Sequence, residues 1–151
     1  MKLESVELIE KKGIKYRLIE LTERAVTVQD VINYSKSKLD HDEICKTILV
    51  KATKDRYYAV LLLGEDLIDF PKLKKVIGKF RIATLDEVHD VTGNGPGEVS
   101  PLTVNTPLLV DKRVLRKTRI NFGSGNKFFG LEIMSEDLET LVDYSLVDVI
   151  K

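Results

Sequence analysis

The chain has 151 residues, of which 43% are hydrophobic and 32% are charged, and its 24 lysines and arginines balance its 24 aspartates and glutamates. This length suits one domain with a single core, and the composition excludes a disordered chain or a membrane-embedded one. The longest apolar run, residues 59–63, is too short to cross a bilayer and Met1-Lys2-Leu3-Glu4 has no signal-peptide pattern, so we expect a cytoplasmic protein.

The first half of the chain predicts two helices and three strands. Leu3, Val6 and Ile9 recur at helical spacing, and Thr27 with Asp30 has the form of a capping box. Residues 57–63 are apolar enough for a strand buried on both faces. We expect a helix from Leu3 towards Gly13, a strand over residues 16–21, a helix from Thr27 to about Lys38, and a central hairpin of strands 44–50 and 57–63.

The second half alternates short helices and strands. Pro71 suits the first position of a helix that Gly78 closes, and Thr84 and Ser135 suit helix N-caps. We expect helices over residues 71–76, 84–91 and from Ser135, strands over residues 80–83, 105–110 and 145–150, a turn capped by Asp111, and a hairpin of residues 119–122 and 128–133. The economical fold is a single α+β domain over residues 1–151, with a mixed, mostly antiparallel sheet and helices packed around it.

A loop rich in glycine and proline, residues 93–101, interrupts this regular pattern. It holds three of the nine glycines and two of the four prolines of the chain. Alternate glycines permit positive φ, and the prolines fix φ beside them, so backbone N–H groups can be held at one point. Such a cradle suits a phosphate, a carboxylate or an oxyanion, while a plain surface turn is the alternative.

Lys46 is the unusual residue of its predicted strand. By alternation it shares a face with Ile44, Ile48 and Val50, whereas Cys45 lies on the opposite face. An ammonium on an apolar face either extends to the edge of the sheet or points into a cleft that takes an anion. We interpret Cys45 as a small core residue rather than a nucleophile.

The sequence lacks the common motifs for metal binding, nucleotide binding and nucleophilic catalysis. One cysteine and two separated histidines, His41 and His89, cannot make a disulfide or a Cys/His zinc cluster, and no Walker, dinucleotide or nucleophile-elbow motif occurs. We therefore expect no metal and no cofactor. Nucleic-acid binding would depend on local basic patches, which are also compatible with ordinary solvated faces. They are Lys11, Lys12, Lys15 and Arg17; Lys72, Lys74, Lys75, Lys79 and Arg81; and Lys112, Arg113, Arg116, Lys117 and Arg119.

Four segments, in order along the chain, resemble the YbaK/EbsC family. They are Cys45-Lys46-Thr47-Ile48-Leu49-Val50, Pro71-x-Leu73-Lys74-Lys75-x-x-Gly78, Gly93-x-x-x-Gly97-x-Val99-Ser100-Pro101-Leu102, and Gly130-Leu131-Glu132-Ile133 before an acidic helix. The family includes free-standing aminoacyl-tRNA deacylases and the editing domain of bacterial prolyl-tRNA synthetases. The resemblance implies hydrolysis of mischarged tRNA, most often alanine or cysteine on proline tRNA, with prolyl-tRNA synthetase as a possible partner.

The resemblance also implies which residues form the site. The essential lysine falls on Lys46, the loop glycine on Gly97, and an acidic pocket position on Glu132. Two loop positions depart from the family, because Asn94 stands where many members carry tyrosine and Glu98 where many carry glycine. The expected substrate-binding residues are Thr47, Gly93, Asn94, Gly95, Pro96, Glu98, Val99, Ser100, Pro101 and Ser124.

Two further functions stay open at this point. The balanced charge and the departures in the loop also suit a non-catalytic module that binds tRNA ends or a synthetase. A pocket for a free nucleotide or phosphate is the third possibility. Full-length tRNA contacts would give a steep loss of affinity with salt, and a small pocket a shallow one.

Overall fold

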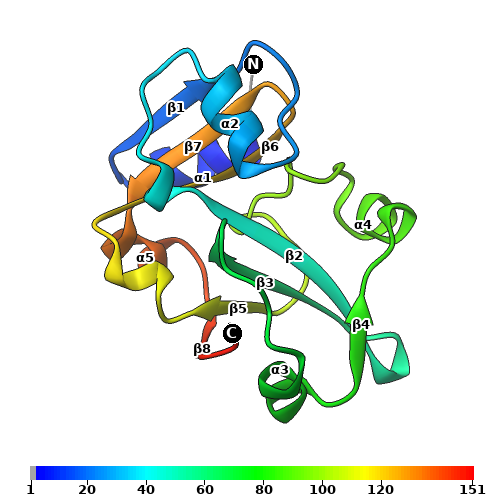
Figure 1. Cartoon of the computed structure of the whole chain (residues 1–151). Coiled ribbons are helices and arrows are strands. Elements are labelled where there is room, and N and C mark those ends of the chain that lie inside the picture. Colours follow the sequence, from blue (N-terminus) through cyan, green and yellow to red (C-terminus); the bar gives the residue numbers. More distant parts are fainter. Residues whose placement is uncertain (1–2) are drawn as a thin grey trace.

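Eight strands form two sheets in the computed structural model, which describes residues 3–151 (Figure 1). Met1 and Lys2, which belong to the opening segment considered above, lie outside the described residues. The smaller sheet has the order β1-β7-β6 and is antiparallel throughout. Its strands are β1 (Tyr16–Glu20), β6 (Arg119–Asn126) and β7 (Phe129–Met134).

The larger sheet has the order β4-β2-β3-β5-β8. Its strands are β2 (Cys45–Ala52), β3 (Tyr57–Leu63), β4 (Phe80–Ile82), β5 (Leu108–Asp111) and β8 (Ser145–Val147). The β2–β3 hairpin lies in the middle as predicted, and β5 is parallel to both β3 and β8. The α+β class with mostly antiparallel pairing is therefore confirmed, although the strands divide between two sheets that touch at an Ile44–Asn121 bridge.

Strand β3 is buried on both faces because each face meets its own hydrophobic cluster. Leu61 packs with Ile120 and Leu131 between the two sheets, whereas Leu62 packs with Leu73 on the other face. The uninterrupted apolar sequence of β3 follows from this double burial. Because β2 pairs with this buried strand, the residues of β2 are held in fixed positions.

Five α-helices, four short 3-10 helices and the two sheets account for the regular structure of residues 3–151. Thr27 and Thr84 both make complete capping boxes, and Gly78 ends its helix with φ of 82°, as their sequence positions predict. The helices are α1 (Glu4–Lys11), α2 (Val28–Tyr34), α3 (Phe70–Ile77), α4 (Leu85–Thr92) and α5 (Leu138–Leu141). No helix of the described chain is both long and apolar enough to cross a bilayer.

Some predicted boundaries are wrong for identifiable reasons. Helix α2 ends at Tyr34, before Lys38, because Ser35 is extended and bridges to Leu21. Strand β5 begins only after Pro107, which has no N–H for the ladder. Ser135 does not cap a helix, because its hydroxyl donates to the Lys117 carbonyl and the chain continues as a 3-10 turn.

Candidate functional site

A cavity of about 630 Å³ opens where β2, β6, the 93–101 loop and the start of α4 meet. Its lining is mainly apolar, with a few polar groups from separate elements, which is the usual make-up of a small-molecule site. Strand β4 pairs only with Val50–Ala52, so the first half of β2 has no second paired strand in its own sheet and lines the cavity. The fold thus exposes one strand edge where β2 carries Lys46.

Lys46 lines this cavity and is half-buried. Burial lowers the pKa of its ammonium group, and the negative charge of Asp66 partly opposes that shift. Within residues 3–151 no carboxylate forms an ion pair with Lys46, although twelve such pairs exist elsewhere. A partly desolvated cation without a partner is suited to binding an anionic or carbonyl oxygen.

Gly97 lines the same cavity from the loop, and its position requires glycine for two reasons. Its φ is +83°, and a Cβ atom there would lie 2.3 Å from the Ala25 carbonyl oxygen. Its N–H makes no hydrogen bond with any group of the described chain. The loop therefore has a backbone N–H beside the cavity that no group of the described chain accepts. Any residue other than glycine at position 97 would disturb the loop conformation.

The two loop positions that depart from the family hold the loop in place. Glu98 pairs with Arg24, with 3.1 Å between Oε2 and Nε. The Asn94 side-chain amide donates to the Gly125 carbonyl at 3.0 Å, and the Gly125 N–H donates back to the Glu98 carbonyl at 2.8 Å. The loop is thereby tied both to the segment before α2 and to the β6–β7 hairpin.

The structure brings five of the predicted site residues together on the cavity lining. They are Lys46, Thr47, Pro96, Gly97 and Val99. The other predicted loop residues do not line the cavity. Ser100, for example, is buried and accepts a hydrogen bond from the Leu102 N–H at 3.2 Å. Those outside the lining are Gly93, Asn94, Gly95, Glu98, Ser100 and Pro101.

Glu132 and Ser124 also lie outside the cavity lining. The Glu132 carboxylate accepts a hydrogen bond from Arg17 at 2.8 Å across the β1–β7 pair. The Ser124 hydroxyl donates to the Phe129 carbonyl at 2.6 Å and holds the β6–β7 turn. The catalytic role of Glu132 and the substrate-binding role of Ser124 stay predictions.

Asn121 is a polar residue of the cavity lining that the sequence analysis missed. It is 3% exposed, and its side-chain nitrogen and oxygen are buried without a hydrogen-bond partner among the described residues. The Thr47 hydroxyl is buried and unpaired in the same way. Buried polar groups without partners are uncommon in folded proteins and call for an explanation such as a functional role. In the sequence, the available signal for Asn121 was a polar residue between the apolar Ile120 and Phe122.

Cys45 lines the cavity but does not suit a nucleophile. Burial raises the pKa of its thiol to about 12, so the reactive thiolate is scarce at neutral pH. Its side chain packs in the cluster between the two sheets. This placement confirms its interpretation as a core residue.

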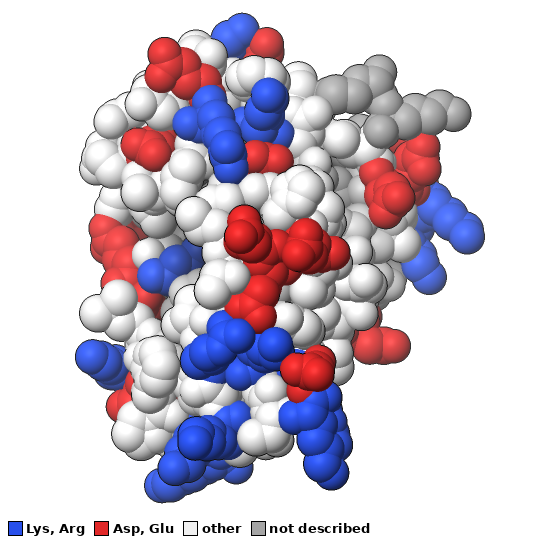
Figure 2. Space-filling view, turned by 90° about the vertical axis from the view of Figure 1, so that its right-hand side faces the viewer, with Lys and Arg blue, Asp and Glu red and all other residues white. Residues whose placement is uncertain are grey.

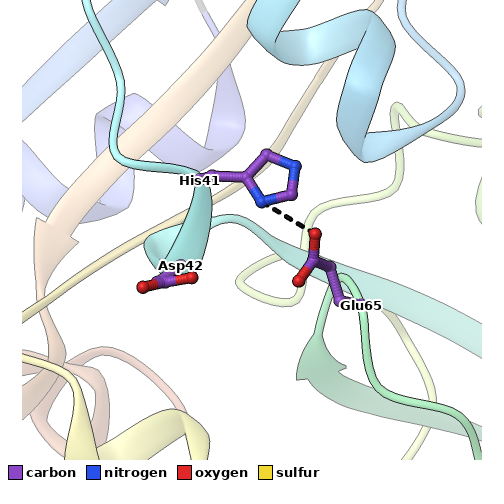
Figure 3. A group of neighbouring side chains, drawn as sticks. All are labelled: His41, Asp42 and Glu65. Carbon is purple, nitrogen blue, oxygen red and sulfur yellow. Dashed lines mark ion pairs between the residues drawn. The ribbon is translucent and has the colours of Figure 1, made fainter.

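His41 and Glu65 lie on the cavity lining as an ion pair, with 2.8 Å between Nδ1 and Oε1 (Figure 3). Asp42, from the same 3-10 turn as His41, lies beside the pair. The possible ligand atoms of the three residues lie within 4.8 Å of one another. Two of the three side chains are exposed, and exposed acidic groups commonly lie together without an ion, so we assign no metal here.

Comparison with known proteins identifies the family and the fold of the chain. The model of the family "Aminoacyl-tRNA editing domain" matches residues 22–147. The hypothetical protein APE2540 is 28% identical, with a TM-score of 0.85 over 98% of this chain and 100% of that one. A proposed trans-editing enzyme for prolyl tRNA synthetase has the same fold, at 21% identity and a TM-score of 0.82 over 100% of this chain and 99% of that one. The match over most of its length shows that the chain belongs to the YbaK-like aminoacyl-tRNA editing domain family.

Proposed function

We propose that the protein is an aminoacyl-tRNA deacylase that acts in trans on mischarged proline tRNA and removes alanine or cysteine. The observation that carries the proposal is that the unpaired Lys46 ammonium and the free Gly97 N–H line one cavity. Membership of the editing-domain family supports the reaction class. The neighbour named as a trans-editing enzyme for prolyl tRNA synthetase favours proline tRNA as substrate and that synthetase as a partner. The cytoplasm, where such a substrate would be met, is the proposed location.

The proposed chemistry needs no protein nucleophile. Lys46 binds the terminal nucleotide or the ester carbonyl as a point charge, and the Gly97 N–H stabilises the oxyanion that forms when water attacks. The water oxygen bonds to the carbonyl carbon, the ester C–O bond breaks, and the ribose oxygen leaves with a proton. An aminoacyl ester is already activated, so positioning and oxyanion stabilisation are sufficient. The high thiol pKa of Cys45 agrees with a mechanism that does not form an acyl-enzyme.

A deacylation panel tests the proposal. Purified protein is incubated with alanyl-, cysteinyl- and prolyl-tRNA(Pro), and release of the labelled amino acid is measured. We expect release of alanine or cysteine and retention of proline. Lys46→Ala should lower the rate by about a hundredfold or more, because it removes charge stabilisation from the transition state.

Lys51→Ala is the matched control. Lys51 lies on the same strand but binds Asp55 and Glu87 rather than the cavity, so its variant should keep the rate within about threefold. Thermal unfolding of both variants shows whether the fold is intact. Full activity of Lys46→Ala removes Lys46 from the mechanism, and tRNA binding without cleavage of any ester selects the non-catalytic module instead.

A further inference from the structure

Four lysines without ion-pair partners gather at one end of the larger sheet. Lys74 and Lys75 lie in the last turn of α3, and Lys79 follows just before β4. The pairing of Phe80 with Ala52 brings Lys79 beside the β2–β3 turn that carries Lys54. We name Lys54, Lys74, Lys75 and Lys79 the lysine end; all four are exposed, and none forms an ion pair within residues 3–151.

The nearby carboxylates are already engaged by other groups. Asp55 pairs with Lys51, and Glu87 pairs with Arg81 and Lys51. Asp148 pairs with Lys72, Lys112 and Arg113. Two members of the basic patch seen in the sequence, Lys72 and Arg81, are therefore neutralised, whereas the lysine end keeps its full positive charge in a chain of zero net charge.

Aromatic and apolar side chains accompany these lysines. Phe70 and Phe80 stack with ring centroids 4.9 Å apart, and Phe70 is 47% exposed. Figure 2 shows lysine and arginine side chains gathered over the lower part of one face, at the level of α3 and β4, below a group of acidic side chains. Exposed aromatic planes beside cations are typical of surfaces that bind nucleic acid.

The lysine end is continuous with the cavity. Strand β4 leads from Phe80 to Ile82, and Ile82 and Leu85 line the cavity. The three residues of extended chain from Lys79 to Ile82 span about 10 Å. A ligand that reaches from the cavity along β4 therefore meets the lysine end directly.

We propose that the lysine end binds the phosphate backbone of the tRNA substrate while the aminoacyl ester lies in the cavity. This inference rests on the proposed function and adds where the body of the substrate binds. Cations without protein partners release counterions from RNA at little cost, since no internal ion pair is broken. Because the net charge of the protein is zero, attraction to the tRNA depends on local groups of unpaired cations such as the lysine end.

The test compares two triple charge reversals with the same change in net charge. Lys74→Glu/Lys75→Glu/Lys79→Glu alters the lysine end, and Lys11→Glu/Lys12→Glu/Lys15→Glu alters exposed lysines near the end of α1 that also lack ion pairs. Each protein is assayed on full-length mischarged tRNA and on the same aminoacyl ester of adenosine. The salt dependence of binding to uncharged tRNA is measured in parallel.

We expect the lysine-end variant to lose about tenfold or more in kcat/KM on full-length tRNA and to keep its rate on the adenosine ester, since only the tRNA reaches the lysine end. The slope of log Kd against log salt should fall by about one for each phosphate contact removed. The α1 variant should match wild type on both substrates. Unchanged activity of the lysine-end variant on tRNA, or equal losses in both triple variants, would overturn the proposal.

The outcomes separate this inference from the proposed function. If wild type cleaves neither substrate, the deacylase proposal fails. Binding of uncharged tRNA then tests by itself whether the lysine end is the tRNA-binding surface. Weaker tRNA binding of the lysine-end variant than of the α1 variant supports the surface in that case. Equal binding rejects it.

Discussion

Lys46 and Lys51 lie on the same strand, five residues apart, and have opposite surroundings. Lys51 has Asp55 at 3.3 Å and Glu87 at 3.4 Å, and its hydrogen bond to Asp55, then that to Glu87, raises the pKa of its ammonium. Lys46 has no such partner in the described chain, and burial lowers its pKa. The difference shows that residue type alone does not single out a candidate functional lysine, whereas the position of the carboxylates does. At the cavity lining, the Lys46 ammonium has no carboxylate ion-pair partner in the described chain and can therefore bind a ligand.

The largest effect in this comparison is expected at Gly97, which lines the same cavity as Lys46. Gly97→Ala places a Cβ atom against the Ala25 carbonyl oxygen at a φ of +83°, so the loop must move, and the N–H would leave the oxyanion position that we propose for it. We expect deacylation to fall by about a hundredfold to a thousandfold, as when an oxyanion donor is removed. The measurement is the single-turnover rate on mischarged tRNA.

Gly93→Ala is the control for backbone strain. Gly93 also has positive φ, +75°, but a Cβ atom there meets nothing within 4 Å. This variant should lose about 1 kcal/mol of folding stability and keep its catalytic rate. Equal rate losses in the two variants would mean that loop stability, and not the Gly97 donor, explains the effect.

A smaller effect is expected from the ion pair that holds the loop. Glu98→Gln weakens the contact with Arg24, a partly exposed pair worth up to about 1 kcal/mol, so the rate should fall by no more than about fivefold. Glu20→Gln, which breaks the exposed Lys36 pair outside the loop and the cavity lining, should leave the rate unchanged. A loss of activity as large as that of Gly97→Ala would show that Glu98 itself takes part in the chemistry.

The smallest effect is a pH dependence of stability. Burial lowers the folded-state pKa of Lys46, so the unfolded chain binds this proton more tightly, and the wild type gains stability as pH rises from that pKa towards the ordinary value of 10.5. Lys46→Met removes the cost of the buried charge. Its thermal midpoint at pH 7 should equal or exceed that of wild type, with the gap narrowing above pH 10. A clearly lower midpoint at pH 7 would show that the Lys46 ammonium stabilises the fold.

Local sequence rules predicted much of the fold. The capping boxes at Thr27 and Thr84 and the alternating strands around Lys46 depend on near neighbours, and their prediction succeeded. The division into two sheets and the role of Ser135 depend on distant partners, such as the Lys117 carbonyl, that no local pattern encodes.

The candidate site was predictable to the same degree. Lys46 and the loop glycine were found from motif and resemblance, and both line the cavity. Asn121 was missed, because its burial and lack of partners arise only when β6 bridges to Ile44, the residue just before β2. Lys54 was likewise absent from the predicted basic patch, since it joins the lysine end only through the pairing of β2 with β4.

The central claim is that Lys46 and Gly97 act on one substrate in one cavity. Nuclear magnetic resonance of labelled protein tests it directly, with a titration of an alanyl-adenosine analogue in which an amide replaces the ester. We predict that the Gly97 amide and the Lys46 side-chain signals shift together with a single Kd, while the Lys51 signals stay in place. A shift of one without the other, or saturation at two different Kd values, would contradict the account.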